Sequence, residues 1–196
     1  MKEKENVYQL TLISMMVALL IMQTFVPILG YIPLGPIDVT IVHITVILSA
    51  VLFGAKFGTI IGTIWGALSM LRAFIQPTPF NIVFLNPLIS ILPRLLVGLI
   101  SASVFGILKD RMPRTGAYAV TAAVGTLTNT VLVLGSIYLF ASEAYAGALG
   151  ISESALLGAL GTIVATNGVI EMIAAVIILP VLALALEKFV MRTARR

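Results

Sequence analysis

Residues Phe84–Gly98 read FLNPLISILPRLLVG, an apolar stretch that carries a single cation, Arg94. Pro87 and Pro93 interrupt any helix formed here, because proline lacks a backbone N–H and clashes with the preceding turn. A guanidinium at the centre of a bilayer costs at least ~2.5 kcal/mol on insertion scales. Arg94 therefore needs a polar partner, supplied either by the protein or by a bound ligand.

The rest of the chain shares this apolar character. Of its 196 residues, 60% are hydrophobic and only 10% are charged, and the mean hydropathy is +1.13. Soluble domains carry roughly 25% charged residues, so the composition predicts an all-α integral membrane protein. The sequence has no cysteine, which excludes disulfides and thiolate metal sites, and one histidine, which leaves no cluster for zinc. We therefore expect neither a metal nor a cofactor in this chain.

Apolar runs near the ~20 residues needed to cross a bilayer alternate with turn-rich or charged loops. Residues 55–57 are predicted to form a tight turn, and residues 142–154 an outer loop with a short surface helix. The pattern predicts a single membrane domain over residues 1–196, with six transmembrane helices at roughly 8–29, 39–54, 58–73, 81–108, 116–141 and 155–187.

The basic residues predict the orientation of these six spans. If the N-terminus is inside, ten of the twelve Lys and Arg residues fall on the cytoplasmic side. The positive-inside rule therefore predicts that the N and C termini are both cytoplasmic. The expected location is a prokaryotic plasma membrane, which the chain crosses several times.

Polar side chains recur near the middle of these spans. At a rise of ~1.5 Å per residue, Arg94, Asn129 and Asn167 lie at similar depths, and Glu171 follows one turn later. Intramembrane polar residues usually face a bundle interior or a cavity, so we expect one binding cavity that opens to the outside. The other side chains predicted to bind substrate are Tyr31, Thr40, His43, Trp65, Ser69, Gln76, Asn86 and Tyr138.

These residue types favour a small ligand that bears a carboxylate. The planar fork of Arg94 suits a carboxylate or a phosphate, and asparagine amides suit hydroxyls and amides. Trp65, Tyr31 and Tyr138 add apolar walls with a polar handle. The sequence holds no nucleophile–base set, paired acidic motif or Walker A motif. The chain is therefore not expected to be an enzyme, and another protein must supply the energy for any uphill transport.

Several of these features have a purely structural alternative. Arg94 and Glu171 can form a buried ion pair, Asn129 and Asn167 can link helices, and His43 and Trp65 can pack in the core. Arg72 is expected at the lipid–water interface. Glycines at positions 58, 62 and 66 are expected to form a smooth stripe for helix packing.

Three segments resemble the substrate-binding S components of energy-coupling factor (ECF) vitamin transporters: Asp38–Gly58, Gly62–Ser69 and Phe84–Gly98. The first has a Thr-x-x-His-x-x-Val pattern that leads to a Gly-x-x-x-Gly turn. The third has the Asn-Pro and Pro-Arg pairs. The resemblance covers essentially the whole chain and is strongest for the pantothenate-specific members. It implies a protein that captures a small-molecule vitamin from outside. The net charge of +4 does not indicate a nucleic-acid partner, because the basic residues lie at the ends of the segments.

The resemblance also implies partners. An S component docks on a membrane coupling protein that carries two cytoplasmic ATPases, topples in the bilayer and releases its vitamin inward, so that ATP is used by the partners. Docking uses small residues on the first helix, which here are Ser14 and Ala18. Tyr31, Pro33 and Gln76 are candidates to close over the ligand. The alternatives left open are an S component for a folate, pyridoxine or thiamine type of vitamin, and a non-transporting scaffold or regulatory subunit.

Overall fold

The computed structural model describes residues 2–32 and 38–193, with side chains for residues 10–32 and 38–187. Most of this part is helical. The α-helices are α1 Lys2–Phe25, α2 Val42–Phe53, α3 Ala55–Ile75, α4 Pro87–Ser90, α5 Leu92–Leu108, α6 Arg114–Phe140, α7 Ser142–Leu149, α8 Glu153–Ile163 and α9 Val169–Thr193. The shorter elements are the antiparallel strands β1 Tyr31–Ile32 and β2 Val39–Thr40, the 3₁₀-helix η1 Ile82–Leu85 and the π-helix η2 Val164–Gly168.

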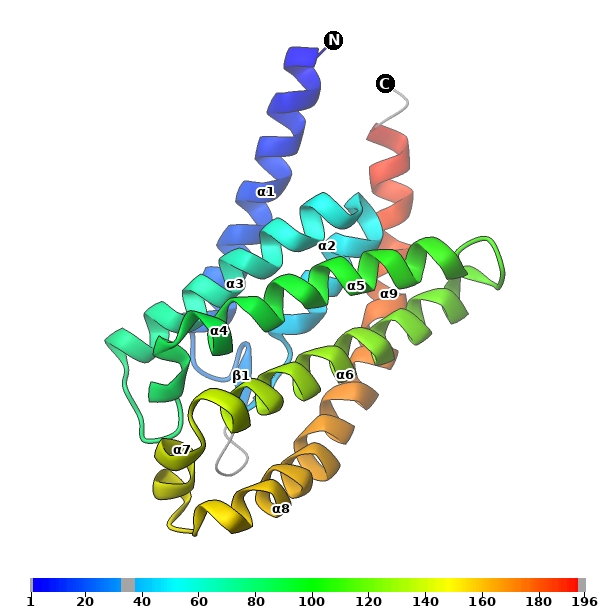
Figure 1. Ribbon diagram of the computed structural model, residues 1–196. Helices are drawn as coiled ribbons and strands as arrows, with labels where there is room; N and C mark the ends of the chain where they lie inside the picture. The colour runs from blue at the N-terminus through cyan, green and yellow to red at the C-terminus, as the bar shows by residue number, and fades with distance from the viewer. Residues whose placement is uncertain (1, 33–37, 194–196) are drawn as a thin grey trace.

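Figure 1 shows that α1 and α9 bring both termini to one end of the molecule, whereas the β1–β2 hairpin and α7 lie toward the other end. α3 packs against α5, α5 against α6, and α6 against α9. α2 lies inside this arrangement, with residues 42–51 all buried. Its 12 residues rise about 18 Å, which is too short for a hydrocarbon layer of about 30 Å. α2 is instead enclosed by protein.

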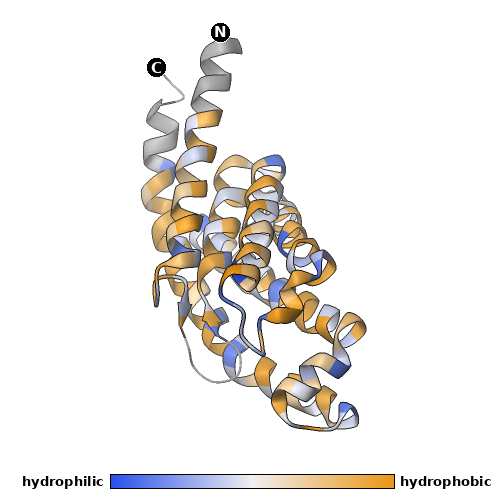
Figure 2. Ribbon diagram, turned by 90° about the vertical axis from the view of Figure 1, so that its left-hand side faces the viewer, coloured by the Kyte–Doolittle hydropathy of each residue, from blue (hydrophilic) through white to orange (hydrophobic). Residues whose placement is uncertain are grey.

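Within the described residues, four helical segments are long and apolar enough to cross a membrane: Ala55–Ile75, Pro87–Leu108, Arg114–Phe140 and Glu153–Glu187. Two apolar helices are shorter, Leu10–Phe25 and Val42–Phe53. Hydrophobic residues, drawn in orange, dominate the helices in Figure 2. The predicted all-helical class is therefore confirmed, and its long apolar helices are those of a membrane protein.

The fourth predicted span is a broken helix, as its two prolines indicate. It consists of η1, α4 and α5, with breaks at Asn86 and Ile91. Pro87 occupies the first turn of α4, where a missing N–H costs nothing, and the Asn86 side chain accepts a hydrogen bond from the Leu88 N–H at 3.0 Å. The second break comes immediately before the turn that carries Arg94.

Several helix bounds differ from the predicted spans. α1 ends at Phe25 rather than near residue 29, and Ile28 just beyond it has a positive φ of 69°. α2 begins only at Val42, because the preceding residues pair as strand β2. The predicted turn over residues 55–57 is wrong. Gly54 alone makes the turn with a φ of 87°, a value that glycine adopts without strain, and α3 starts at the next residue. The predicted short helix in the loop over residues 142–154 is confirmed as α7.

The contact between α3 and α5 explains the glycine stripe. A Cβ at Gly62 would overlap the backbone carbonyl oxygen of Arg94, and a Cβ at Gly98 would overlap the backbone of Gly58. The two helices therefore touch through their backbones, which only glycine permits at these positions. This confirms the packing role of the stripe, and it also fixes the backbone from which the Arg94 side chain extends.

Buried apolar side chains form two separate clusters. The first surrounds α2 and includes Ile47, Trp65 and Leu179. The second joins α6 to α7 and α8, and includes Ile137 and Leu156. The long C-terminal helical segment contributes to both clusters, α8 to the second and α9 to the first, and the π-helix η2 lies between its two halves.

Candidate functional site

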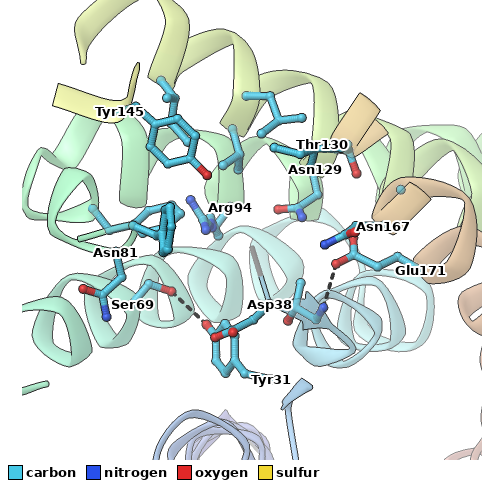
Figure 3. A pocket seen from close by; sticks show the side chains of 18 of the residues that line it. Tyr31, Asp38, Ser69, Asn81, Arg94, Asn129, Thr130, Tyr145, Asn167 and Glu171 are labelled. Atoms are coloured by element: carbon cyan, nitrogen blue, oxygen red, sulfur yellow. Dashed lines mark hydrogen bonds between the residues drawn. The ribbon is translucent and has the colours of Figure 1, made fainter. Parts of the chain in front are cut away.

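A cavity of about 260 Å³ is lined by residues of several elements, among them the β1–β2 hairpin and α7, which lie away from the two termini in Figure 1. Its wall combines residues from the hairpin, α3, the α3–α4 loop, α5, α6, α7 and η2–α9 (Figure 3). The apolar lining residues include Val133, Leu134 and Ile137 of α6 together with Phe80 and Phe84. The polar lining residues include Tyr31, Asp38, Thr40, Ser69, Arg72, Asn81, Arg94, Asn129, Thr130, Tyr145, Asn167 and Glu171.

Arg94 lies near the centre of the labelled side chains in Figure 3 and is 5% exposed. Its guanidinium carbon lies 5.1 Å from the ring centroid of Trp65 and 4.8 Å from that of Phe84, distances at which an aromatic face attracts a cation. Nη1 donates a hydrogen bond to the Ile89 carbonyl at 2.6 Å, whereas the buried Nε has no hydrogen-bond partner in the described part of the chain. The protein thus anchors this cation and leaves part of its donor capacity unused.

Glu171 has a different partner. Its Oε1 accepts a hydrogen bond from the backbone N–H of Thr40 at 2.6 Å, which ties strand β2 to α9. Among the described side chains, the ion pairs are Arg72–Asp38 and Arg114–Glu187, so the alternative of an Arg94–Glu171 pair is not found. Asn167 lies beside Glu171 in Figure 3. Asn167 and Glu171 therefore bring polar groups that can bind ligand hydroxyls close together in the cavity wall.

Tyr31 is held in the cavity wall by a small hydrogen-bond network. Trp65 Nε1 donates to the Tyr31 hydroxyl at 3.0 Å, and Ser69 Oγ lies 3.3 Å from the same hydroxyl while donating to the Trp65 carbonyl at 3.0 Å. Trp65 itself is fully buried and does not line the cavity. The prediction that Trp65 forms a pocket wall is therefore corrected. Trp65 instead contacts two residues that do line the cavity, Tyr31 through a hydrogen bond and Arg94 through its ring.

Arg72, which was predicted to lie at the lipid–water interface, has partners on the hairpin side of the cavity. It forms an ion pair with Asp38 at 3.1 Å, and its guanidinium carbon lies 4.2 Å from the Tyr31 ring centroid. These three residues border both the main cavity and a smaller one of about 190 Å³. Gln76 lines only the smaller cavity, and its role in closing over the ligand stays a prediction.

Three further predicted positions lie outside the main cavity. His43 is fully buried in the core around α2, where helix packing surrounds it. Asn86 is the N-cap of α4, and Tyr138 is 43% exposed near the end of α6. Pro33 lies outside the described residues. The seven predicted residues that do line the cavity are Tyr31, Thr40, Ser69, Arg94, Asn129, Asn167 and Glu171.

Several lining residues were missed by the sequence analysis. Thr130 follows Asn129 on α6, and Val133, Leu134 and Ile137 continue the same helical face at spacings of three and four residues. This spacing is typical of one face of a helix, so it could have indicated from the sequence that these residues line the cavity with Asn129. Asp38, Asn81 and Tyr145 come from loops or a loop helix, where no periodicity indicates which side chain turns inward.

Three buried polar atoms of the cavity wall lack a hydrogen-bond partner within residues 10–32 and 38–187: Arg94 Nε, Asn129 Oδ1 and the Tyr145 hydroxyl. A buried polar group left unpaired costs about 1–3 kcal/mol. A ligand that satisfies these groups recovers that free energy on binding. The arrangement is typical of a site built to receive a small polar molecule.

A helical protein with long apolar helices and a cavity lined by buried, unpaired polar groups of the described chain has the features of a membrane protein that binds a small solute. The sequence model of the family described as "ECF transporter, substrate-specific component" matches residues 8–183. The chain belongs to this family, which is one of transporter components and not of enzymes.

Two bacterial relatives resemble the chain over most of its length. The pantothenic acid transporter PanT of Lactococcus lactis subsp. cremoris (strain MG1363) is 36% identical over 167 residues, which cover 78% of this chain and 80% of the relative. The pantothenate transporter PanT of Leuconostoc mesenteroides subsp. mesenteroides is 32% identical over 177 residues, which cover 86% and 87%.

Proposed function

We propose that this chain is the S component that binds pantothenate in an ATP-driven ECF importer. The observation that carries the substrate assignment is Arg94, a buried cation in the cavity wall that has no carboxylate partner in the described part of the chain. Two relatives named as pantothenate or pantothenic acid transporters support the same assignment. An anionic vitamin completes the charge pairing that the protein itself leaves open.

The chemistry of pantothenate fits the polar and apolar residues that line the cavity. Its carboxylate suits Arg94, and its amide and two hydroxyls suit Asn129, Asn167 and Glu171, which offer both donors and acceptors. The gem-dimethyl group suits the apolar face of α6 rather than Trp65, because Trp65 lies behind the wall.

The proposed transport cycle places the chain in a prokaryotic plasma membrane as six spans with both termini cytoplasmic. The cavity then opens outward, through the loops at the end remote from the termini. A coupling protein with two ATPases is the proposed partner. Ser14 and Ala18 are exposed and lie one turn apart on α1, so a small-residue surface is available for close helix docking.

Calorimetric titration of the purified chain in detergent tests the substrate assignment. We expect saturable binding of pantothenate and much weaker binding of pyridoxine and thiamine, which lack a carboxylate for Arg94. Folate, which has two carboxylates and a larger body, tests the limit set by the cavity of about 260 Å³. Tighter binding of another vitamin would reassign the substrate, and binding of none would favour a scaffold.

A further inference from the structure

Tyr145 is a buried tyrosine in the wall of the cavity. It lies on α7, the short helix after α6, and is 1% exposed. Its ring packs edge-on against Phe80 of the α3–α4 loop, with centroids 6.3 Å apart. Its hydroxyl has no hydrogen-bond partner within the described chain. Buried tyrosine hydroxyls usually find a partner, so this one indicates a group that arrives with a ligand.

The hydroxyl is directed into the cavity. Figure 3 shows it pointing toward Arg94 and Asn129 rather than back into α7. Burial raises the pKa of Tyr145, so the phenol stays protonated and able to donate. Within the described residues, the nearby Arg94 Nε is also a donor without a partner.

A ligand group that serves both residues must accept hydrogen bonds. Arg94 can only donate, and a neutral phenol is most useful beside it as a second donor. A carboxylate has two oxygens with about four acceptor positions, more than an alcohol offers, and its charge strengthens each bond. Asn129 Oδ1, an unpaired acceptor, suits an N–H or O–H elsewhere on the ligand.

We propose that the Tyr145 hydroxyl donates a hydrogen bond to the ligand carboxylate that Arg94 binds, which makes Tyr145 a specificity-determining residue. This inference rests on the proposed function, because it takes pantothenate as the ligand. It gives α7 a direct part in selecting acids over neutral analogues. The loop helix then recognises the same functional group as the broken fourth span.

The variant Tyr145→Phe removes the hydroxyl and keeps the ring that packs on Phe80. Calorimetry with pantothenate is compared with its neutral analogue pantothenol, in which an alcohol replaces the carboxylate. Hydrogen bonds to charged groups are the stronger class, so we expect pantothenate to bind about 10- to 100-fold more weakly to the variant. The affinity for pantothenol should change by less than about 5-fold.

Tyr138→Phe is the matched control, because Tyr138 is 43% exposed and does not line the cavity. It should bind both ligands like the wild type. Melting temperatures without ligand check that Tyr145→Phe is folded.

Unchanged pantothenate affinity in Tyr145→Phe would overturn the inference alone. An equal loss for both ligands would also overturn it, since that result indicates general packing rather than recognition of the carboxylate. If the wild type binds no pantothenate, the proposed function and this inference both fall.

Discussion

Replacing Arg94 by lysine and by alanine separates its charge from its geometry. Arg94 is anchored through Nη1 to the Ile89 carbonyl at 2.6 Å and lies against two aromatic rings, so its position is fixed before ligand binds. Arg94→Lys keeps the charge and loses the planar fork. Arg94→Ala loses both, and removes a cation that is 5% exposed.

The expected losses of pantothenate affinity follow from the burial of Arg94. Truncating one partner of a buried, hydrogen-bonded charge pair costs about 2–5 kcal/mol, which corresponds to about 30- to 4,000-fold weaker pantothenate binding in Arg94→Ala. Loss of one charge-assisted hydrogen bond costs about 1.5–3 kcal/mol, so Arg94→Lys should bind about 10- to 150-fold more weakly. Without ligand, two effects oppose each other: the alanine variant leaves the Ile89 carbonyl unpaired but removes a buried charge.

Calorimetry on the detergent-purified variants measures these affinities, and melting temperatures show whether each variant is folded. Arg114→Ala is the control, since Arg114 is half-exposed at the start of α6 and pairs with Glu187 far from the cavity. It should bind like the wild type. Wild-type affinity in Arg94→Ala would refute the assignment of Arg94 as the residue that binds the carboxylate.

Two other predictions concern helix contacts. Gly62→Ala should destabilise the protein by about 1–3 kcal/mol and weaken pantothenate binding, because the added methyl overlaps the backbone of Arg94. The matched control is Gly106→Ala, whose methyl meets open space. Equal melting temperatures of the two variants would contradict the prediction. Ala18→Trp should leave vitamin binding intact and abolish uptake in cells that contain the coupling proteins, because it blocks close approach to α1; full uptake would defeat the docking role.

The sequence predicted the parts of the fold that depend on local chemistry. Proline at two positions indicated the breaks before α4 and α5, and long apolar runs indicated the long apolar helices. The positions of Arg94, Asn129 and Glu171 in a shared cavity also followed, because a polar group in an apolar helix is costly unless it faces protein or water.

The direction of a side chain within the bundle was harder to predict. A histidine or tryptophan in an apolar helix indicates burial, but not whether the cavity or the core surrounds it, and both His43 and Trp65 lie in the core. Tyr145 was missed because its place depends on how α7 folds back against the α3–α4 loop. The Arg72–Asp38 pair joins residues 34 positions apart, which no local pattern reveals.

The π-helix η2 has a consequence for how this segment can change over evolutionary time. It joins α8, which packs in the second apolar cluster, to α9, which packs in the first. An insertion or deletion of one residue there would rotate one half by about 100° relative to the other. Either Leu156 and its neighbours or Glu171 and its neighbours would then lose their positions. Natural variation should therefore alter the residue types of this segment more readily than its length.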